Sequence, residues 1–532
     1  MTAPLSSPAL HRSRPKVAIV GAGPGGLAAA MLLAASGARV TVYEKDEVVG
    51  GRTRTLTSPE GYSFDLGPTF FLYPRILKEI FSRCGADLEQ EVDMRRLEPQ
   101  YRLLFEQGGD VTKLDASADL DRMEAEIARI SPEDAKGLRP FMRENRAKLE
   151  AFRPVLERAF STAADMIRPD MIKALPLMKP WSTVDRDLAR HFKDPRVRLA
   201  FSFQTKYLGM SPFKCPALFT ILSFLEYEHG VFHPIGGCGA VSNAMARVAE
   251  RLGADIRLNS PIDRIAFEGR RAKGVEIGGT RHDADAVVVN ADFAGAIPKL
   301  IPDHLRRKGW TDKKISKARY SCSTFMLYLG LDRTLPGVAH HNVILSEQYR
   351  QNIGQIESGE IPEIPSLYVQ HAGATDPTLA PEGHSALYVL VPVPNLIVQP
   401  DWQNQAARFR DIALDRLKVL GLGDLRPHIK YERIVAPHDW EQDYAVGYGA
   451  TFNLAHDLPQ MLLFRPGNRF REVDGVYLVG GGTHPGSGLP VIYEGARITT
   501  GLLAQDLGLS GAPSRPTADS GFRAATPVTA EP

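Results

Sequence analysis

Three glycines near the start of the chain have the spacing of a phosphate-binding turn. Gly21, Gly23 and Gly26 follow the apolar run at residues 16–20 in the pattern G-x-G-x-x-G. The first glycine permits the turn, the second lets backbone approach a pyrophosphate, and the third lets a helix pack closely on a strand. The phosphates would then meet the positive N-terminus of that helix. The pattern predicts a dinucleotide site, and a glycine turn that only packs is the structural alternative.

An acid and a second glycine pair follow this turn. Glu44 ends the apolar run "ARVTVYE", near the position where an acid binds a ribose hydroxyl. Gly51 and Arg52 belong to "EVVGGRT", which would give the longer FAD molecule a second wall. The guanidinium can bind a phosphate through two parallel hydrogen bonds. This element favours FAD over NAD, and a surface turn with a solvated arginine is the alternative.

The elements that must position these residues lie at both ends of the chain. We expect a strand at 16–20, a helix at 28–35 and a strand at 38–44. At the far end, "GVYLVGG" predicts a buried strand, followed by "GSGLPVIYEGARITTGLL" as a loop and a helix with Pro490 near its first turn. The positive N-terminus of that helix would stabilise negative charge on a flavin ring. The two ends are therefore predicted to meet around one FAD.

Four segments in this order resemble the bacterial carotenoid desaturase family, the phytoene-desaturase-type FAD-dependent oxidoreductases. They are the opening motif, "GYSFDLGPTFF", "FHPIGGCGAV" and "VYLVGGGTHPGSGLP", within residues 15–505. The resemblance implies a noncovalent FAD, a hydrophobic tunnel, a polyene or isoprenoid substrate and peripheral membrane attachment. It implies FAD contacts at Gly21, Gly23, Gly26, Glu44, Gly51, Arg52, Gly67, Ile262, Gly482, Gly488, Leu489, Pro490 and Val491.

The expected fold class is α/β, with a discontinuous Rossmann-like FAD-binding domain and an α+β substrate lobe, as in amine oxidases and phytoene desaturases. We expect a helix at 240–252 and strands at "DIRLNSPIDRI" and "ADAVVVNAD". The FAD-binding domain would comprise 15–95, 230–295 and 430–508, and the lobe 96–229 and 296–429. Residues 1–14 are predicted to be a disordered leader and 509–532 a disordered tail.

The lobe contains an aromatic stretch at 201–232, which suits a hydrocarbon without polar groups. An ordinary aromatic core is the alternative for each member, namely Phe201, Phe203, Tyr207, Phe213, Phe219, Phe224, Tyr227 and Phe232. Residues 165–181 mix apolar side chains with cations, as in a segment at a membrane surface. Residues 306–319 carry seven cations and one acid, which fits membrane contact or a solvated face.

Composition excludes several classes of protein. The net charge of +2 gives no field for nucleic acid, and the four separated cysteines form no disulfide framework or zinc site. No apolar run approaches the roughly 20 residues of a spanning helix. These features predict a cytoplasmic protein without a metal, and the resemblance implies that it is attached peripherally, at the inner face of the cell membrane. The sequence leaves the oligomeric state open.

The predicted reaction removes two hydrogens from adjacent carbons of an isoprenoid chain, of the phytoene or C30 dehydrosqualene type. Hydride goes to the flavin and the proton to a base or to water. Glu226, His233, His484 and Glu494 are the candidate polar residues. The alternatives are a carotenoid terminal-methyl oxygenase or ketolase of the same superfamily, an amine oxidase, and a prenyl-lipid-binding escort protein without catalysis.

Overall fold

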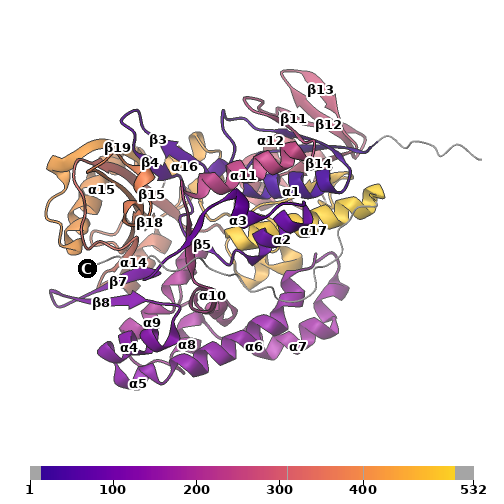
Figure 1. Cartoon of the computed structure of the whole chain (residues 1–532). Coiled ribbons are helices and arrows are strands. Elements are labelled where there is room, and N and C mark those ends of the chain that lie inside the picture. Colours follow the sequence, from indigo (N-terminus) through magenta and orange to yellow (C-terminus); the bar gives the residue numbers. More distant parts are fainter. Residues whose placement is uncertain (1–13, 308, 400, 510–532) are drawn as a thin grey trace, which may run out of the picture.

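The computed structural model describes residues 14–307, 309–399 and 401–509 (Figure 1). The predicted leader and tail lie outside these residues, apart from residues 14 and 509 at their borders. Two large sheets organise the described part of the chain, and helices cover them. The α/β class predicted from the sequence is confirmed.

The first sheet is parallel throughout and joins distant parts of the chain in the order β10-β2-β1-β14-β20. Its strands are β1 (Lys16–Val20), β2 (Arg39–Tyr43), β10 (Asp255–Arg257), β14 (Ala286–Val289) and β20 (Val476–Leu478). All four residues of β14 are buried, as expected for a central strand covered on both faces. This arrangement is the predicted Rossmann-like sheet assembled from separate segments.

Three helices pack together on this sheet, namely α1 (Pro24–Ala35), α11 (Cys238–Arg251) and α17 (Leu489–Leu507). Helix α1 is rich in alanine and almost fully buried, as is typical of a helix that is apolar on all sides. A Cβ atom on Gly25 would lie 2.5 Å from a side-chain carbon of Val479 and 3.0 Å from one of Ile492. Helix α1, near the start of the chain, is therefore in direct contact with α17 and with the residue that follows β20, near its end.

The second sheet has seven strands in the order β19-β15-β18-β17-β16-β7-β8, antiparallel except for the β16–β7 pair. They are β7 (Tyr101–Gln107), β8 (Asp110–Ala116), β15 (Ser323–Leu331), β16 (His341–Leu345), β17 (Leu367–His371), β18 (Ser385–Val393) and β19 (Ile429–Val435). The predicted FAD-binding segment begins at residue 430, whereas β19 pairs with β15 of this sheet. The division into a domain and a lobe stays a prediction.

Smaller sheets accompany these two. They comprise β3 (Thr55–Thr57) with β4 (Ser63–Asp65), β5 (Phe71–Leu72) and β6 (Met94–Arg96) with β9 (Val231–Pro234), and β11 (Arg264–Glu268), β12 (Arg271–Ile277) and β13 (Thr280–Asp283). The prediction of one strand over "DIRLNSPIDRI" was wrong. Asn259 has a left-handed φ of 50°, which ends β10 and separates it from β11.

A group of helices lies along the lower edge of the molecule in Figure 1. It comprises α4 (Leu120–Ile130), α5 (Pro132–Ala135), α6 (Leu138–Leu156), the 3₁₀ turn η2 (Ala163–Ile167), α7 (Pro169–Met178), α8 (Val184–Leu188), α9 (Pro195–Ala200) and α10 (Ile221–His229). The other helices are α2 (Arg75–Arg83), α3 (Leu88–Glu91), α12 (Phe293–Leu300), α13 (Asp312–Lys317), α14 (Tyr349–Ser358), α15 (Trp402–Arg416) and α16 (Pro437–Gln442). None of the helices in the described part of the chain has the length and apolar character needed to span a membrane.

Candidate functional site

The first glycine turn connects β1 to α1 with the geometry that its spacing predicts. Gly21 has a φ of +95°, and its amide donates to the Tyr43 carbonyl (2.8 Å). A Cβ atom on Gly26 would lie 2.1 Å from the Gly21 carbonyl oxygen, so this position requires glycine. Gly23 is the N-cap of α1, where the first helical N–H groups have no intrahelical partner. The turn therefore presents free donors to an anion.

Glu44 directly follows β2 and is buried beside this turn. Its carboxylate accepts hydrogen bonds from the amides of Ala22 (2.7 Å) and Asp46 (3.1 Å). Burial raises the pKa of Glu44, and the two amides oppose this effect. A carboxylate has about four lone-pair positions, so two remain for a ribose diol. The residue fits the role predicted for it.

The second glycine turn packs against the first. The Gly50 amide donates to the Ala22 carbonyl (2.8 Å), and a Cβ atom on Gly51 would lie 3.4 Å from the Gly23 Cα. Arg52 follows, and its Nη1 donates to a backbone carbonyl, that of Thr451 (2.6 Å). Loss of hydration lowers the pKa of Arg52, and the charge of Asp292 opposes this. A guanidinium held by a neutral carbonyl keeps donors for a phosphate.

Gly67 lies in a loop fixed between Arg52 and the seven-stranded sheet. A Cβ atom on Gly67 would lie 2.9 Å from the Arg52 carbonyl oxygen. Tyr328 and Tyr388, which are paired across β15 and β18, donate their hydroxyls to the carbonyls of Leu66 (2.5 Å) and Gly67 (2.6 Å). Sequence reasoning missed these tyrosines because no local motif links them to the loop. Their position within apolar runs of the sequence was the one indication that these tyrosines would be buried.

The predicted C-terminal residues gather at the start of α17. Gly488, the N-cap of α17, is exposed with a φ of +101°, and nothing lies within 4 Å of its Cβ position. Leu489, Pro490 and Val491 form the first turn of the helix. In contrast, a Cβ atom on Gly482 would lie 2.6 Å from Phe293, so this glycine serves close packing.

Ile262 lies between β10 and β11, in a segment that runs beside the acid at the end of β2. The Ser260 amide donates to the Glu44 carbonyl (2.7 Å), which ties this segment to the ribose-type position. Side-chain packing against the first sheet leaves Ile262 partly buried. Its place agrees with the expected backbone contact near an adenine, which stays a prediction.

Glu226 is buried on α10 inside an aromatic group. Its Oε2 accepts hydrogen bonds from Tyr101 (3.0 Å) and Gln204 (3.0 Å), and its Oε1 has no hydrogen-bond partner in the structure. Burial raises the pKa of Glu226 to about 7, and the hydrogen bonds from Gln204 and Tyr101 oppose it. This carboxyl group can therefore hold or release a proton near neutral pH.

The other three candidates each have a structural partner, and for Glu494 that partner lies on the same helix. The His233 Nε2 lies 3.1 Å from Asp376, and both residues are buried. The His484 Nε2 donates to the Arg158 carbonyl (2.7 Å), and burial lowers the pKa of His484 to about 4. Burial also raises the pKa of Glu494 to about 7, beside Arg497 at 3.1 Å. These contacts favour a structural role for each residue.

Two further observations bear on the site. Among the described residues, no group of three or more His, Cys, Asp or Glu is placed to hold a metal ion. In the stretch 306–319, Arg306 is buried and bonded to the Ile301 and Trp310 carbonyls and to Asp312. The prediction that this cation belongs to a membrane-facing or solvated charge run was therefore wrong.

Comparisons with known proteins agree with this geometry. Residues 24–499 match the family described as flavin containing amine oxidoreductase. The chain is 44% identical to a 4,4'-diapophytoene desaturase (4,4'-diapolycopene-forming) of Methylomonas sp, covering 92% of this chain and 95% of the relative. It is 41% identical to an all-trans-zeta-carotene desaturase of Myxococcus xanthus, covering 94% and 95%.

Solved structures show the same fold at low sequence identity. A putrescine oxidase bound to putrescine has a TM-score of 0.59 at 17% identity, covering 93% of this chain and 99% of that one. An oxidoreductase from Methanosarcina mazei has a TM-score of 0.60 at 18% identity, covering 90% and 98%. The chain therefore has the two-domain FAD-binding fold and belongs to the flavin containing amine oxidoreductase family, as a flavoenzyme of its carotenoid desaturase branch.

Proposed function

We propose that this enzyme uses noncovalent FAD to desaturate a carotenoid precursor of the phytoene or C30 dehydrosqualene type. The observation that carries the proposal is the contact between the two distant glycine-rich ends, at Gly25, Val479 and Ile492. It creates one site with two helix N-termini, those of α1 and α17. Two relatives that match more than nine tenths of the chain are a 4,4'-diapophytoene desaturase and an all-trans-zeta-carotene desaturase.

The chain's own residues would hold FAD as follows. Backbone donors at Gly23 and the start of α1 would bind the pyrophosphate, Arg52 would pair with a phosphate, and Glu44 would bind a ribose. The first turn of α17, from Gly488, would stabilise negative charge on the ring. When bound, FAD supplies the acceptor for a hydride equivalent from the substrate.

The substrate would lie against a group of aromatic side chains around Phe70, which comes shortly after Gly67 in the chain. The Phe70 ring stacks on His341 at 4.2 Å and lies 5.5 Å from Tyr207 and 5.2 Å from Tyr368. Aromatic faces suit a conjugated hydrocarbon, and they stabilise positive charge that develops along it. Glu226 accepts a hydrogen bond from Tyr101, whose ring lies 6.0 Å from that of Phe70, and it is the best-placed proton acceptor among the described residues.

The enzyme would work in the cytoplasm, attached peripherally to the inner face of the cell membrane, where such a precursor dissolves. Large apolar side chains exposed at 167–181 support attachment to a lipid surface. The proposal includes no nucleic-acid partner.

The test is product analysis. FAD-loaded protein is incubated with phytoene, dehydrosqualene or lycopene in liposomes, and the products are identified by absorbance and mass. Products lighter by two hydrogens, or by multiples of two, support desaturation. A gain of oxygen would instead identify a terminal-methyl oxygenase.

The variant Gly23→Val tests the position of the pyrophosphate. Its side chain should occupy the space through which the pyrophosphate approaches the backbone and so abolish FAD retention. Within the protein, the nearest neighbour of a Cβ atom at Gly23 is the Asn290 side chain at 3.0 Å.

A further inference from the structure

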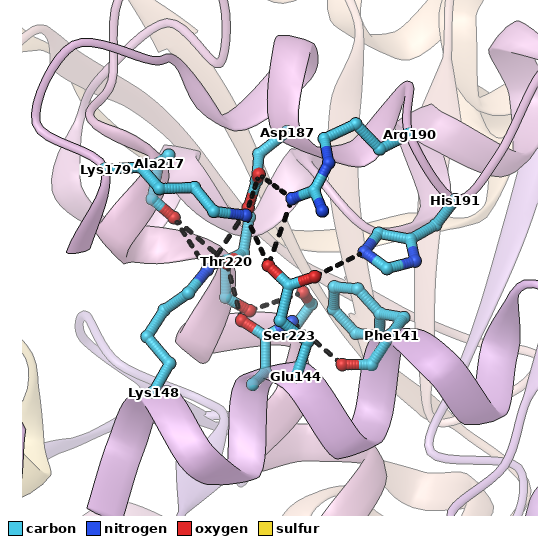
Figure 2. Close-up of polar contacts among 11 residues, drawn as sticks. Phe141, Glu144, Lys148, Lys179, Asp187, Arg190, His191, Ala217, Thr220 and Ser223 are labelled. Atoms are coloured by element: carbon cyan, nitrogen blue, oxygen red, sulfur yellow. Dashed lines mark hydrogen bonds and ion pairs between the residues drawn. The ribbon is translucent and has the colours of Figure 1, made fainter. Parts of the chain in front are cut away.

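Cations inside this protein are paired with carboxylates in two clusters. In the ionic network that anchors the C-terminal end of α7, Lys148 pairs with Asp187 at 3.2 Å, and both side chains are at most 3% exposed (Figure 2). Lys179, the C-cap of α7, bonds to Asp187 (2.7 Å) and to Glu144 in the same network. In the second cluster, the buried Arg306 pairs with a carboxylate of α13 at 2.6 Å. A charge that is buried without such a partner is strongly destabilising.

Arg465 is buried at 2% exposure, and no carboxylate in the part of the chain that the structure describes forms an ion pair with it. Its two terminal nitrogens donate instead to four backbone carbonyls, namely those of Leu454 (3.2 Å), Ala455 (3.3 Å), Gln460 (3.5 Å) and Gly481 (2.7 Å). Burial lowers the pKa of Arg465 to about 9, so the guanidinium keeps its charge at neutral pH. The carbonyl oxygens satisfy its hydrogen bonds but leave that charge uncompensated.

Hydrogen bonds connect Arg465 to the turn that leads into α17. The shortest one goes to the Gly481 carbonyl, and a Cβ atom on Gly481 would lie 3.1 Å from the Ser487 Cβ. Ser487 directly precedes Gly488, the N-cap of α17. This helix N-terminus is the one that the proposed function assigns to the flavin ring. The charge of Arg465 therefore lies beside the residues that form this part of the proposed site.

His456 fixes the same turn and responds to the same charge. Its Nε2 accepts a hydrogen bond from the Ser487 amide (3.1 Å), and the residue is 2% exposed. Burial holds the pKa of His456 well below its ordinary value, and the charge of Arg465 lowers this pKa further. A protonated imidazole nitrogen cannot accept a hydrogen bond. The guanidinium therefore favours the neutral form of His456, which this turn requires.

We propose that Arg465 supplies a full positive charge that stabilises the reduced flavin ring, in addition to the N-terminus of α17. A hydride carries two electrons and one proton, so its transfer from a substrate C–H bond leaves one negative charge on the ring until a second proton binds. A fixed charge in the interior acts more strongly than one in water and needs no rearrangement during the reaction. A carboxylate partner would cancel this effect. The inference rests on the proposed function, because it requires FAD at this site.

The test compares Arg465→Gln, which removes the charge but keeps an amide donor, with Arg465→Lys, which keeps the charge. The reduction potential of the bound flavin is measured without oxygen against a reference dye. Arg465→Gln should shift the equilibrium between oxidised and reduced flavin about tenfold toward the oxidised form, which for two electrons is a potential about 30 mV lower. Arg465→Lys should have a potential close to that of the wild type. An unchanged potential in Arg465→Gln, or a fall of the same size in Arg465→Lys, would overturn the proposal.

The matched control is Arg306→Gln, which opens an equally buried cluster whose charge is compensated by a carboxylate. It should lower the midpoint temperature of thermal unfolding and leave the flavin potential unchanged. If the potential fell equally in Arg306→Gln and in Arg465→Gln, loss of packing rather than loss of charge would be the cause, and the proposal would be wrong.

Titration with added FAD covers the case in which Arg465→Gln binds the cofactor weakly. This variant should lose about tenfold more affinity for reduced FAD than for oxidised FAD, and equal losses would contradict the role of the charge. The proposed function fails in a different way. A wild type that binds FAD but forms no desaturated product contradicts desaturation, while the potentials still decide the role of Arg465. A wild type that binds no FAD would contradict both.

Discussion

At the scale of single residues, the site depends on positions where a side chain cannot fit. Gly21 and Gly26 meet neighbouring backbone within 2.4 Å of a built Cβ atom, so no rotamer can relieve the contact. Gly488 has open space around it and is free for a ligand to approach. The glycines of the two motifs thus differ in purpose. Gly21 and Gly26 allow the first turn to pack, and we expect Gly488 to leave access for the cofactor.

The variant Gly26→Ala tests the packing purpose. Its methyl group would lie 2.1 Å from the Gly21 carbonyl oxygen, so the turn must shift and the phosphate donors must move. We expect lower thermal stability and loss of bound FAD, measured by unfolding scans and flavin absorbance. Gly501→Ala in α17, with nothing within 4 Å, should be neutral or more stable by up to about 1 kcal/mol. Equal behaviour of the two variants would refute the assignment.

The buried carboxyl of Glu226 predicts a dependence of stability on pH. Its pKa is raised from 4.5 to about 7 in the folded protein, so folding favours the protonated form. The stability that it contributes is complete below pH 4.5 and declines as pH rises to about 7. Relative to Glu226→Gln, the wild type should lose about 2 to 3 kcal/mol between about pH 5 and about pH 8. Urea unfolding of both proteins at the two pH values measures this loss. An equal change in the free energy of unfolding with pH in the wild type and in Glu226→Gln would exclude it.

At the scale of elements, the sequence predicted the turns, strands and helices whose formation depends on residues that are neighbours in the chain. The turn at 21–26, β1, α1, α11 and α17 follow from glycine spacing, apolar runs and a proline in the first helical turn. The break at Asn259 was missed because the residues before it alternate as a strand does, although Asn259, Ser260 and Pro261 form a turn signal. The ionic network also escaped prediction, since Glu144, Lys179 and Asp187 come from elements that only the tertiary fold brings together.

Asp187→Ala tests the network that anchors α7. It leaves the buried ammonium group of Lys148 and the partly buried one of Lys179 without their shared carboxylate, which should lower the free energy of unfolding by about 3 to 5 kcal/mol. Glu133→Ala breaks an exposed ion pair with Lys136 and serves as the control, with little expected change. Denaturant titration compares the two variants. A loss of similar size in both would show that burial of the network does not matter.

At the scale of the whole molecule, the proposed cofactor site draws on both large sheets. The Tyr328–Tyr388 pair of the seven-stranded sheet holds the Gly67 loop against Arg52, so we expect FAD binding to depend on both sheets. No sequence pattern links these residues, because the contact spans more than two hundred positions. The family resemblance predicts an FAD contact at Gly67 but does not indicate what fixes this loop.

The central claim is that one FAD, held between the two ends of the chain, receives a hydride equivalent from an isoprenoid hydrocarbon. The most direct measurement is a single turnover without oxygen, with FAD-loaded enzyme and a dehydrosqualene- or phytoene-type chain in liposomes. The account predicts that the visible flavin absorbance is lost as one new double bond forms per flavin. Oxidised flavin that persists beside unchanged hydrocarbon, or a product that contains oxygen, would contradict it.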